Sequence, residues 1–323
     1  MRMILPTFSK TLFNKCFLLG CFPKVWKRVS GIDIPKTDKR KLITVQGYRC
    51  IILLSIPGKY LEKLVIGRLN YFLESTGQIP PQQYGFTAGR STADAIKTVT
   101  EIVRRGCKLA TKCCLLALDI AGAFHNVRHT GILARLWELK CPTNIYSIVK
   151  DFLKDRKTHI RLGDAASSKL VTRGCPQVSV LRPTLWNTII SDLILLLSKA
   201  PNLEIVTFAD DILLMIQGPS HPAVLTTVVN TLRNAEDLCK KHRLKICKDK
   251  TALRPMFIRN RDIHKNHPKI NSWGLNVVTK MKYLGIMIDG KLDWFPHTQY
   301  LENKLLHIRN DAAKPHGVYR TPT

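Results

Sequence analysis

The chain has 323 residues, an apolar content of 45% and a formal net charge of +28. This length and composition allow a substantial core in one large unit or in two to three smaller ones, and they argue against a disordered chain. Lys and Arg outnumber Asp and Glu by 51 to 23, which favours an acidic polymer as partner because Lys and Arg contacts to phosphates release counterions. A merely soluble basic surface explains so large an excess less well.

The cysteines and the hydropathy pattern argue against a zinc-binding, secreted or membrane protein. Cys239, His242 and Cys247 have ligand-like spacing, but their segment also has the pattern of an amphipathic helix, which favours core and surface roles over zinc binding. The scattered cysteines suggest a reducing compartment. Pro and Lys interrupt the apolar patches near the N-terminus, which makes it a poor signal peptide. No apolar run reaches the length of a membrane span, so no membrane partner is expected.

In chain order, hydrophobic spacing predicts packed helices mixed with short strands. Helices are predicted at residues 9–20, 60–73, 91 onward, 131–140, 145–153, 183 onward and 224–242. Strands are predicted at residues 160–162 and 170–172 as a pair, at 204–216 as a hairpin, and at 280–289. Ser91 with Asp94 three residues later is typical of a helix start, and Pro183 suits a first helical turn. The mixture indicates an α+β fold.

Two adjacent carboxylates, Asp210 and Asp211, lie between apolar, β-prone runs. The runs predict a short hairpin with the pair in its turn. Adjacent acids repel each other, and a divalent cation that prefers oxygen ligands, such as Mg²⁺, would neutralise them. A second apolar run ends at Asp119, and two strands that each deliver acid at one end can build a two-metal site for phosphoryl or nucleotidyl transfer. An Asp-Asp pair alone also occurs in ordinary exposed turns.

Five short motifs, in matching order, resemble those of reverse transcriptases. They are residues 84–92 (YGFTAGRST), 118–124 (LDIAGAF), 174–177 (GCPQ), 208–211 (FADD) and 282–286 (KYLGI). The resemblance extends from about Phe22 to about Arg309. It is closest to the polymerase of non-LTR (LINE-like, type I) retrotransposons, particularly those of arthropods that insert in ribosomal DNA.

The resemblance implies the right-hand polymerase fold, an α+β architecture of fingers, palm and the start of a thumb. The implied division is fingers at 1–110, palm at 111–129, a second part of the fingers at 130–165, a second part of the palm at 166–290, and a truncated start of the thumb at 291–323. The implied activity is that of an RNA-directed DNA polymerase, which adds dNTPs to a DNA primer on an RNA template with two Mg²⁺ ions, or Mn²⁺ in their place. It also implies an intracellular protein, nuclear during integration and cytoplasmic in its RNA–protein complex. The oligomeric state stays open.

The resemblance also assigns roles to single residues. Asp119, Asp210 and Asp211 are the implied catalytic metal ligands, with Asp119 and Asp210 as the bridging pair. Lys250 matches a palm Lys that protonates the pyrophosphate leaving group. The remaining implied contacts are Arg49 on the triphosphate through its planar fork, Phe124 as a steric gate beneath the sugar, Gln177 at the incoming nucleotide, and Tyr283, Leu284 and Gly285 at the primer end. Without the resemblance, Phe124 would be better explained as a core residue. Arg49, Gln177 and Lys250 would be better explained as surface residues.

Four positions depart from the family pattern. Cys50 stands in place of Pro, His125 in place of Asp, and Val178 and Arg182 each in place of Gly. Val178 is the gravest change, because glycine permits a close backbone approach that a β-branched residue does not. We therefore expect a fragment of a decaying element, with a catalytically inactive nucleic-acid-binding remnant as the alternative. An RNA-templated RNA polymerase shares the palm, but an aromatic residue at Phe124 argues against it.

Overall fold

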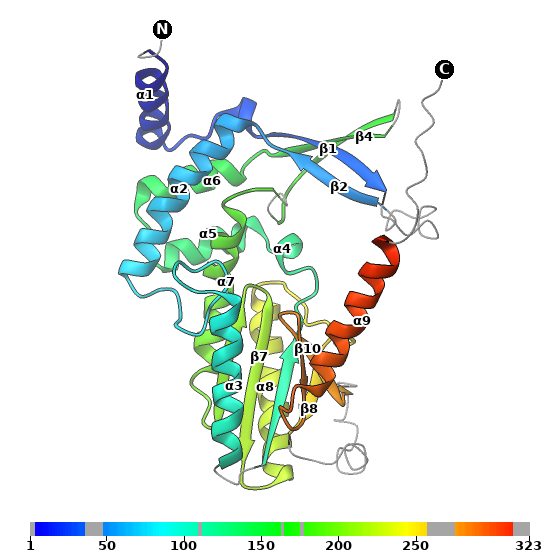
Figure 1. Ribbon diagram of the computed structural model, residues 1–323. Coiled ribbons are helices and arrows are strands. Elements are labelled where there is room, and N and C mark those ends of the chain that lie inside the picture. Colours follow the sequence, from blue (N-terminus) through cyan, green and yellow to red (C-terminus); the bar gives the residue numbers. More distant parts are fainter. Residues whose placement is uncertain are drawn as a thin grey trace, which may run out of the picture.

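The computed structural model describes residues 4–35, 48–108, 112–162, 165–174, 178–256 and 275–312. Figure 1 shows a five-stranded sheet with its helices in the lower part of the molecule and a four-stranded sheet in the upper part. We call them the palm sheet and the fingers sheet; the fingers sheet includes residues 166–170, which the division implied by the sequence assigns to the palm.

The palm sheet has the strand order β6-β7-β3-β8-β9. Its strands are β3 (Lys112–Leu118), β6 (Leu203–Phe208), β7 (Asp211–Gly218), β8 (Ala252–Pro255) and β9 (Asn276–Val277). Strand β3 pairs antiparallel with both β7 and β8, and β6 and β7 form the hairpin predicted at 204–216. Strand β3 therefore occupies the centre of the sheet.

Both faces of the palm sheet are covered, which explains the unbroken apolar sequence of β3. Helix α3 covers one face and helices α7 and α8 the other; their bounds are Thr92–Lys108, Arg182–Leu197 and His221–Lys241. Side chains alternate between faces along a strand, so Leu115 packs with α3 whereas Leu116 packs with α7 and α8. Burying each such leucine stabilises the fold by about 1.5–3 kcal/mol.

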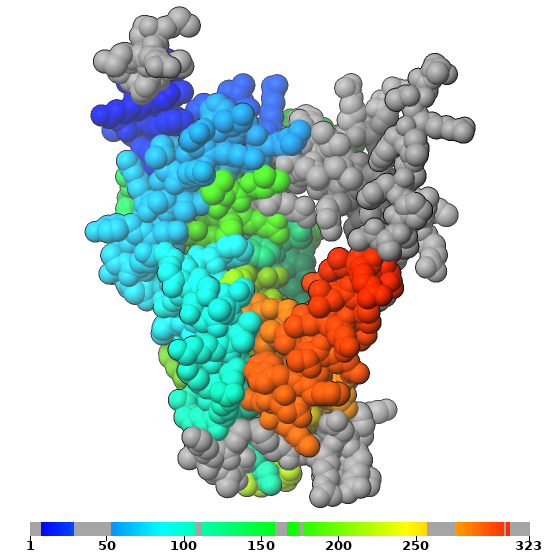
Figure 2. Space-filling view, in the orientation of Figure 1, coloured from blue at the N-terminus to red at the C-terminus, as the bar shows by residue number. Residues whose placement is uncertain are grey.

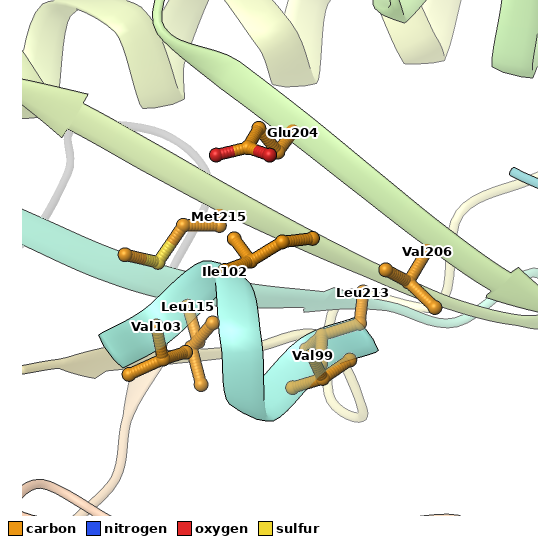
Figure 3. A pocket seen from close by; sticks show the side chains of 8 residues that line it. All are labelled: Val99, Ile102, Val103, Leu115, Glu204, Val206, Leu213 and Met215. Carbon is orange, nitrogen blue, oxygen red and sulfur yellow. The ribbon is translucent and has the colours of Figure 1, made fainter. Parts of the chain in front are cut away.

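Helix α3 leaves a small gap where it packs on the palm sheet. A cavity of about 10 Å³ lies between apolar side chains of α3, β3, β6 and β7 (Figure 3). A volume of this size holds one water at most, and it needs polar partners that these apolar walls do not offer. Glu204 lies at the edge of the cavity, where Arg105 and Gln217 engage its carboxylate. We interpret the cavity as a packing gap and not as a ligand site.

The fingers sheet has the strand order β2-β1-β4-β5, with β1 antiparallel to β2 and parallel to β4. Its strands are β1 (Arg28–Pro35), β2 (Tyr48–Leu53), β4 (Lys157–Leu162) and β5 (Ala165–Leu170). A strand pair forms here as predicted, but with different bounds: β5 shares only Leu170 with the predicted strand at 170–172, and residues 160–162 pair with residues 165–167. The helices of this part are α1 (Ile4–Leu19), the short η1 (Lys24–Trp26), α2 (Ile56–Ser75), α5 (His129–Glu138) and α6 (Thr143–Leu153).

Helix α3 begins where the sequence predicts. The hydroxyl oxygen of Ser91 accepts a hydrogen bond from Asp94 N at 3.3 Å, and the Asp94 carboxylate accepts one from Ser91 N at 2.8 Å. This reciprocal pair satisfies backbone donors that a helix start leaves open. Helix α7 likewise has the predicted Pro183 in its first turn.

The C-terminal part of the chain corrects one prediction. Residues 280–289 form a hairpin, β10 (Lys280–Tyr283) and β11 (Ile286–Asp289), and not a single strand. Leu284 and Gly285 have φ of +45° and +86°, which is the backbone of a tight two-residue hairpin turn. Helix α9 (Phe295–Ala312) follows, and Figure 2 shows it in red alongside the palm, across from α3 in cyan. Among the described residues, no helix combines the length and hydropathy needed to cross a bilayer.

Candidate active site

The three predicted acids come together at one end of the palm sheet. Asp119 directly follows β3, Asp210 lies in the β6–β7 turn, and Asp211 is the first residue of β7 rather than a turn residue. Strands β3 and β7 pair with Leu118 opposite Ile212. This register brings Asp119 beside the Asp pair.

The carboxyl of Asp211 is affected by both of the other acids. The pKa of Asp211 is raised, first because surrounding protein reduces the hydration of its carboxyl and then because Asp210 and Asp119 repel a further negative charge. Within the described ranges, no three Asp, Glu, His or Cys side chains are already arranged to hold a metal ion. The three acids thus have the charge and the oxygen ligands that suit a divalent cation. Their side chains do not already surround a single metal position.

Lys250 lies beside Asp119, as its predicted role requires. Its Nζ is 3.8 Å from Asp119 Oδ2, and 71% of its side chain is exposed. The segment that carries it is tied to the strand end, because Cys247 N donates to Asp119 O at 2.8 Å and Asp119 N donates to Thr251 Oγ1 at 3.5 Å. Hydrogen bonds therefore hold the backbone near Lys250, while its side chain is exposed and its ammonium lies beside Asp119.

A buried glutamine holds the turn that carries Asp210. Gln83 is fully buried; its Oε1 accepts hydrogen bonds from Ala209 N at 3.0 Å and Gly85 N at 2.9 Å, and its Nε2 donates to Ala209 O at 3.4 Å. Ala209 has φ of +60°, a conformation that costs a residue with a side chain roughly 1–2 kcal/mol. Bonds to both its N–H and its C=O offset this cost and fix the residue before Asp210. We call this arrangement the Gln83 clamp.

Helix α7 reinforces the clamp from a second direction. Trp186 Nε1 donates to Ala209 O at 3.0 Å, and Asn187 Nδ2 donates to Gly85 O at 3.1 Å. A Cβ added at Gly85 would lie 2.1 Å from Ala209 N, so this close approach requires glycine. The sequence placed Trp186 in the core and gave Gln83 no role. The only signal available was a pair of polar residues preceding the motif at 84–92.

Phe124 lies in the short helix α4 (Ala123–Asn126), within an aromatic group. Its ring centroid is 5.3 Å from that of Trp186 and 6.2 Å from that of Phe86, and the guanidinium of Arg182 lies 4.4 Å from it. Arg182, one of the departures from the family pattern, thus makes a cation–π contact with the candidate sugar gate. The ring is half-buried, so part of it remains accessible.

Gln177 lies outside the described residues, but the residues before it are anchored beside α4. Gly174 N donates to Val127 O at 2.7 Å, and Gly174 O lies 2.8 Å from His129 Nε2. Its φ is +70°, and an added Cβ would meet the His125 backbone at 2.7 Å, so glycine is required there. Burial lowers the pKa of His125, and the nearby Arg182 lowers it further.

The residues after Gln177 are anchored by a buried acid. Glu62 on α2 is 1% exposed, and its carboxylate accepts hydrogen bonds from Ser179 Oγ and Val180 N at 2.7 Å and from Leu181 N at 3.2 Å. Val178 itself is 37% exposed. It is also not among the residues with a positive φ, so its backbone conformation does not require glycine.

Arg49 and the predicted primer-end residues fall in different settings. Arg49 is in β2, paired with Ile34 of β1, which places it in the fingers sheet; its side chain lies outside the described residues. Tyr283 is 4% exposed, so its ring supports the palm from within, whereas Leu284 and Gly285 form the turn beyond it. The pKa of Tyr283 is raised by burial and then by Asp211, which places its ring close to the acids.

Acids at the ends of two paired strands, a lysine beside them and a separate fingers sheet form the arrangement that the sequence led us to expect of a nucleotidyl-transferring polymerase. Residues 34–288 match the family described as reverse transcriptase (RNA-dependent DNA polymerase). The chain belongs to the reverse transcriptase family, as its motifs led us to expect.

The relatives include retrotransposon proteins of insects. The chain is 29% identical to the Retrovirus-related Pol polyprotein from type-1 retrotransposable element R1 of Bradysia coprophila, over 99% of this chain and 32% of that protein. It is 30% identical to the RNA-directed DNA polymerase from mobile element jockey of Drosophila melanogaster, over 90% of this chain and 32% of that one. The chain thus spans about a third of the length of these relatives.

Solved structures support the fold. The apo telomerase of Candida tropicalis superposes with a TM-score of 0.57 over 90% of this chain and 53% of that one, at 12% identity. At this identity the likeness shows the fold alone, and the fold is the predicted right-hand polymerase architecture.

Proposed function

We propose that this chain catalyses RNA-directed DNA synthesis. The 3′-hydroxyl of a DNA primer attacks the α-phosphate of a dNTP chosen by an RNA template, and pyrophosphate leaves. The observation that carries this proposal is the convergence of Asp119, Asp210 and Asp211 at the ends of paired palm strands. The reverse transcriptase family match and the relative named RNA-directed DNA polymerase support the reaction type.

The three acids would hold divalent cations, two Mg²⁺ ions or Mn²⁺ in their place. When bound, such a pair lowers the pKa of the attacking hydroxyl and stabilises the charge on the leaving oxygen. Burial raises the pKa of Asp211 and repulsion by Asp210 and Asp119 raises it further; a bound cation would relieve this repulsion, which supports the assignment. Asp119 comes from β3, whereas the Gln83 clamp fixes the turn of Asp210, so the protein positions the ligands from two directions.

The surrounding residues suit the remaining steps. In this proposal Lys250 donates a proton to the leaving pyrophosphate, and the position of its ammonium beside Asp119 supports that role. Phe124 is partly exposed, and in this proposal its ring lies beneath the sugar of the incoming nucleotide. In the same proposal, Arg49 contacts the triphosphate and Gln177 the incoming nucleotide, and the turn at Leu284 and Gly285 contacts the primer end.

Extension of a DNA primer on an RNA template with Mg²⁺ tests this function. Asp210→Asn should bring extension below detection, because the amide is a poor substitute for a charged metal ligand, while the dissociation constant for RNA stays nearly unchanged. Asp237→Asn is the matched control, since Asp237 is an exposed acid on α8 and should not affect extension.

Equal extension by Asp210→Asn and the parent would contradict the assignment. A parent chain that binds RNA but never extends a primer would instead support the alternative of a nucleic-acid-binding remnant.

A further inference from the structure

A basic hollow lies at the base of the fingers sheet, apart from the three palm acids. Its volume is about 620 Å³, and η1, the start of β1, the end of α6 and the start of β4 surround it. These elements meet in the upper part of Figure 1. The hollow is lined by five cationic side chains, Lys24, Lys27, Arg28, Lys154 and Lys157. We call it the fingers hollow.

One of these cations is built into the protein. Lys27 is only 5% exposed, and its Nζ lies 3.0 Å from Asp151 Oδ2. The same carboxylate oxygen accepts a hydrogen bond from Phe22 N at 2.6 Å. A buried lysine requires such a partner, so the charge of Asp151 is committed to Lys27 and is not available to the other cations.

The other four cations repel one another across the hollow. Arg28 and Lys157 are direct neighbours on the parallel strands β1 and β4, and like charges at such positions are destabilising. None of the four forms an ion pair with an acid that the structure describes. The described lining contains two acids, Asp151 and Asp155, so five positive and two negative charges leave a formal +3.

We propose that the fingers hollow binds the phosphate backbone of a single nucleic-acid strand. An anion is the ligand that relieves this repulsion, and a volume of a few hundred Å³ suits several groups of a polymer better than one ion. Lys24 belongs to η1, Arg28 and Lys157 begin β1 and β4, and Lys154 directly follows α6, so regular structure fixes the backbone that carries each cation. The choice of nucleic acid as the anion rests on the proposed function, but the binding itself does not require the palm chemistry.

The test compares two double variants with the same change in net charge. Lys154→Ala/Lys157→Ala removes two cations of the fingers hollow. Lys240→Ala/Lys241→Ala removes two lysines from the end of α8, where Lys240 already pairs with Glu236 and Asp237. The probe is a fluorescein-labelled, unstructured 20-nucleotide RNA, and fluorescence anisotropy of the full chain gives the dissociation constant at several KCl concentrations.

The hollow variant should reduce the slope of log affinity against log salt by about 1.4, since each phosphate contact to a single strand contributes about 0.7. The α8 variant should change the slope by less than half as much. A DNA strand of the same sequence should show the same loss, because the proposed contacts are to the backbone. A melting temperature close to that of the parent verifies folding, and Lys154→Gln/Lys157→Gln replaces the first variant if it unfolds.

Equal losses in the two double variants would overturn the proposal, because binding would then follow total charge and not the hollow. Inorganic phosphate that displaces RNA from the parent at equal phosphate concentration would also overturn it, since the hollow would then be a site for free anions. Neither result would bear on primer extension. The assignment of the palm acids is tested separately, by the extension assay with Asp210→Asn.

Discussion

The palm turn and the fingers hollow differ in how many like charges they gather and in how firmly the protein holds them. In the palm, like charges are few and the backbone around them is fully engaged, because Gln83 and Trp186 both bond Ala209 beside Asp210. In the fingers hollow, like charges are many, and the one acid that is well placed is already paired with Lys27. A site for chemistry must hold its groups in one geometry, whereas a site for a polymer's backbone needs mainly charge.

The largest effect expected from this comparison concerns the Gln83 clamp. Gln83→Leu leaves the buried N–H groups of Gly85 and Ala209 without acceptors, at a cost of about 1–3 kcal/mol for each group. If about half of the cost for one group falls on the transition state, single-turnover extension slows roughly two- to twelvefold, at about 1.4 kcal/mol per tenfold. Loss of both would multiply the effect. The Mg²⁺ concentration for half-maximal extension should rise as well, because Asp210 would no longer be held in place.

Gln82→Leu is the matched control, because Gln82 engages the turn through its backbone carbonyl, which accepts from Thr207. It should keep the parent's Mg²⁺ requirement. A Gln83→Leu protein that melts at a lower temperature but needs no more Mg²⁺ would show that Gln83 serves stability alone and does not position the acids.

A smaller effect is expected at Phe124. Phe124→Val shortens the side chain beneath the proposed sugar position, so the ratio of ribonucleotide to deoxynucleotide incorporation should rise severalfold. Competing single additions of rNTP and dNTP measure this ratio. Phe152, a fully buried Phe at the end of α6, gives the contrast, because Phe152→Val should lower stability without changing the ratio. An unchanged ratio in an active Phe124→Val protein would leave Phe124 as a packing residue.

The smallest effect concerns stability against pH. The folded protein holds a proton on Asp211 more tightly than the unfolded chain does, so this carboxyl lowers the free energy of unfolding as pH rises from about 3.8 through the raised pKa. Asp211→Asn removes that penalty and should raise the melting temperature slightly at pH 7, with a gain that shrinks as pH falls. Asp237→Asn removes an acid that pairs with Lys240 and should give no gain. A gain at Asp211 that does not depend on pH would contradict the electrostatic explanation.

The metal-ligand candidates could be found from sequence because acids at the ends of apolar runs are a local pattern. Asp119, Asp210 and Asp211 each follow or interrupt a β-prone run, and strand pairing alone then brings them together. The capping pair of Ser91 and Asp94 was predictable for the same reason, since all of its atoms lie within four residues.

The Gln83 clamp could not be predicted, because Gln83 and Ala209 are 126 residues apart. A polar residue before a motif gives no sign that it will be buried, and the positive φ of Ala209 has no signal in a residue that is not glycine. The hairpin at residues 280–289 was missed for a related reason, since Leu284 adopts a turn conformation that its side chain does not favour. The fingers hollow depends on β1 and β4 becoming neighbours, which the spacing of Arg28 and Lys157 does not reveal.

The central claim is that chemistry and strand binding occupy separate places in this chain. Measuring the single-turnover extension rate at saturating template together with the RNA dissociation constant tests it directly, in the parent, in Asp210→Asn and in Lys154→Ala/Lys157→Ala. We predict that Asp210→Asn loses the rate and keeps the affinity, while the double variant keeps the rate and loses affinity. A double variant that loses rate at saturating template, or an Asp210→Asn protein that loses affinity to the same extent, would contradict the claim.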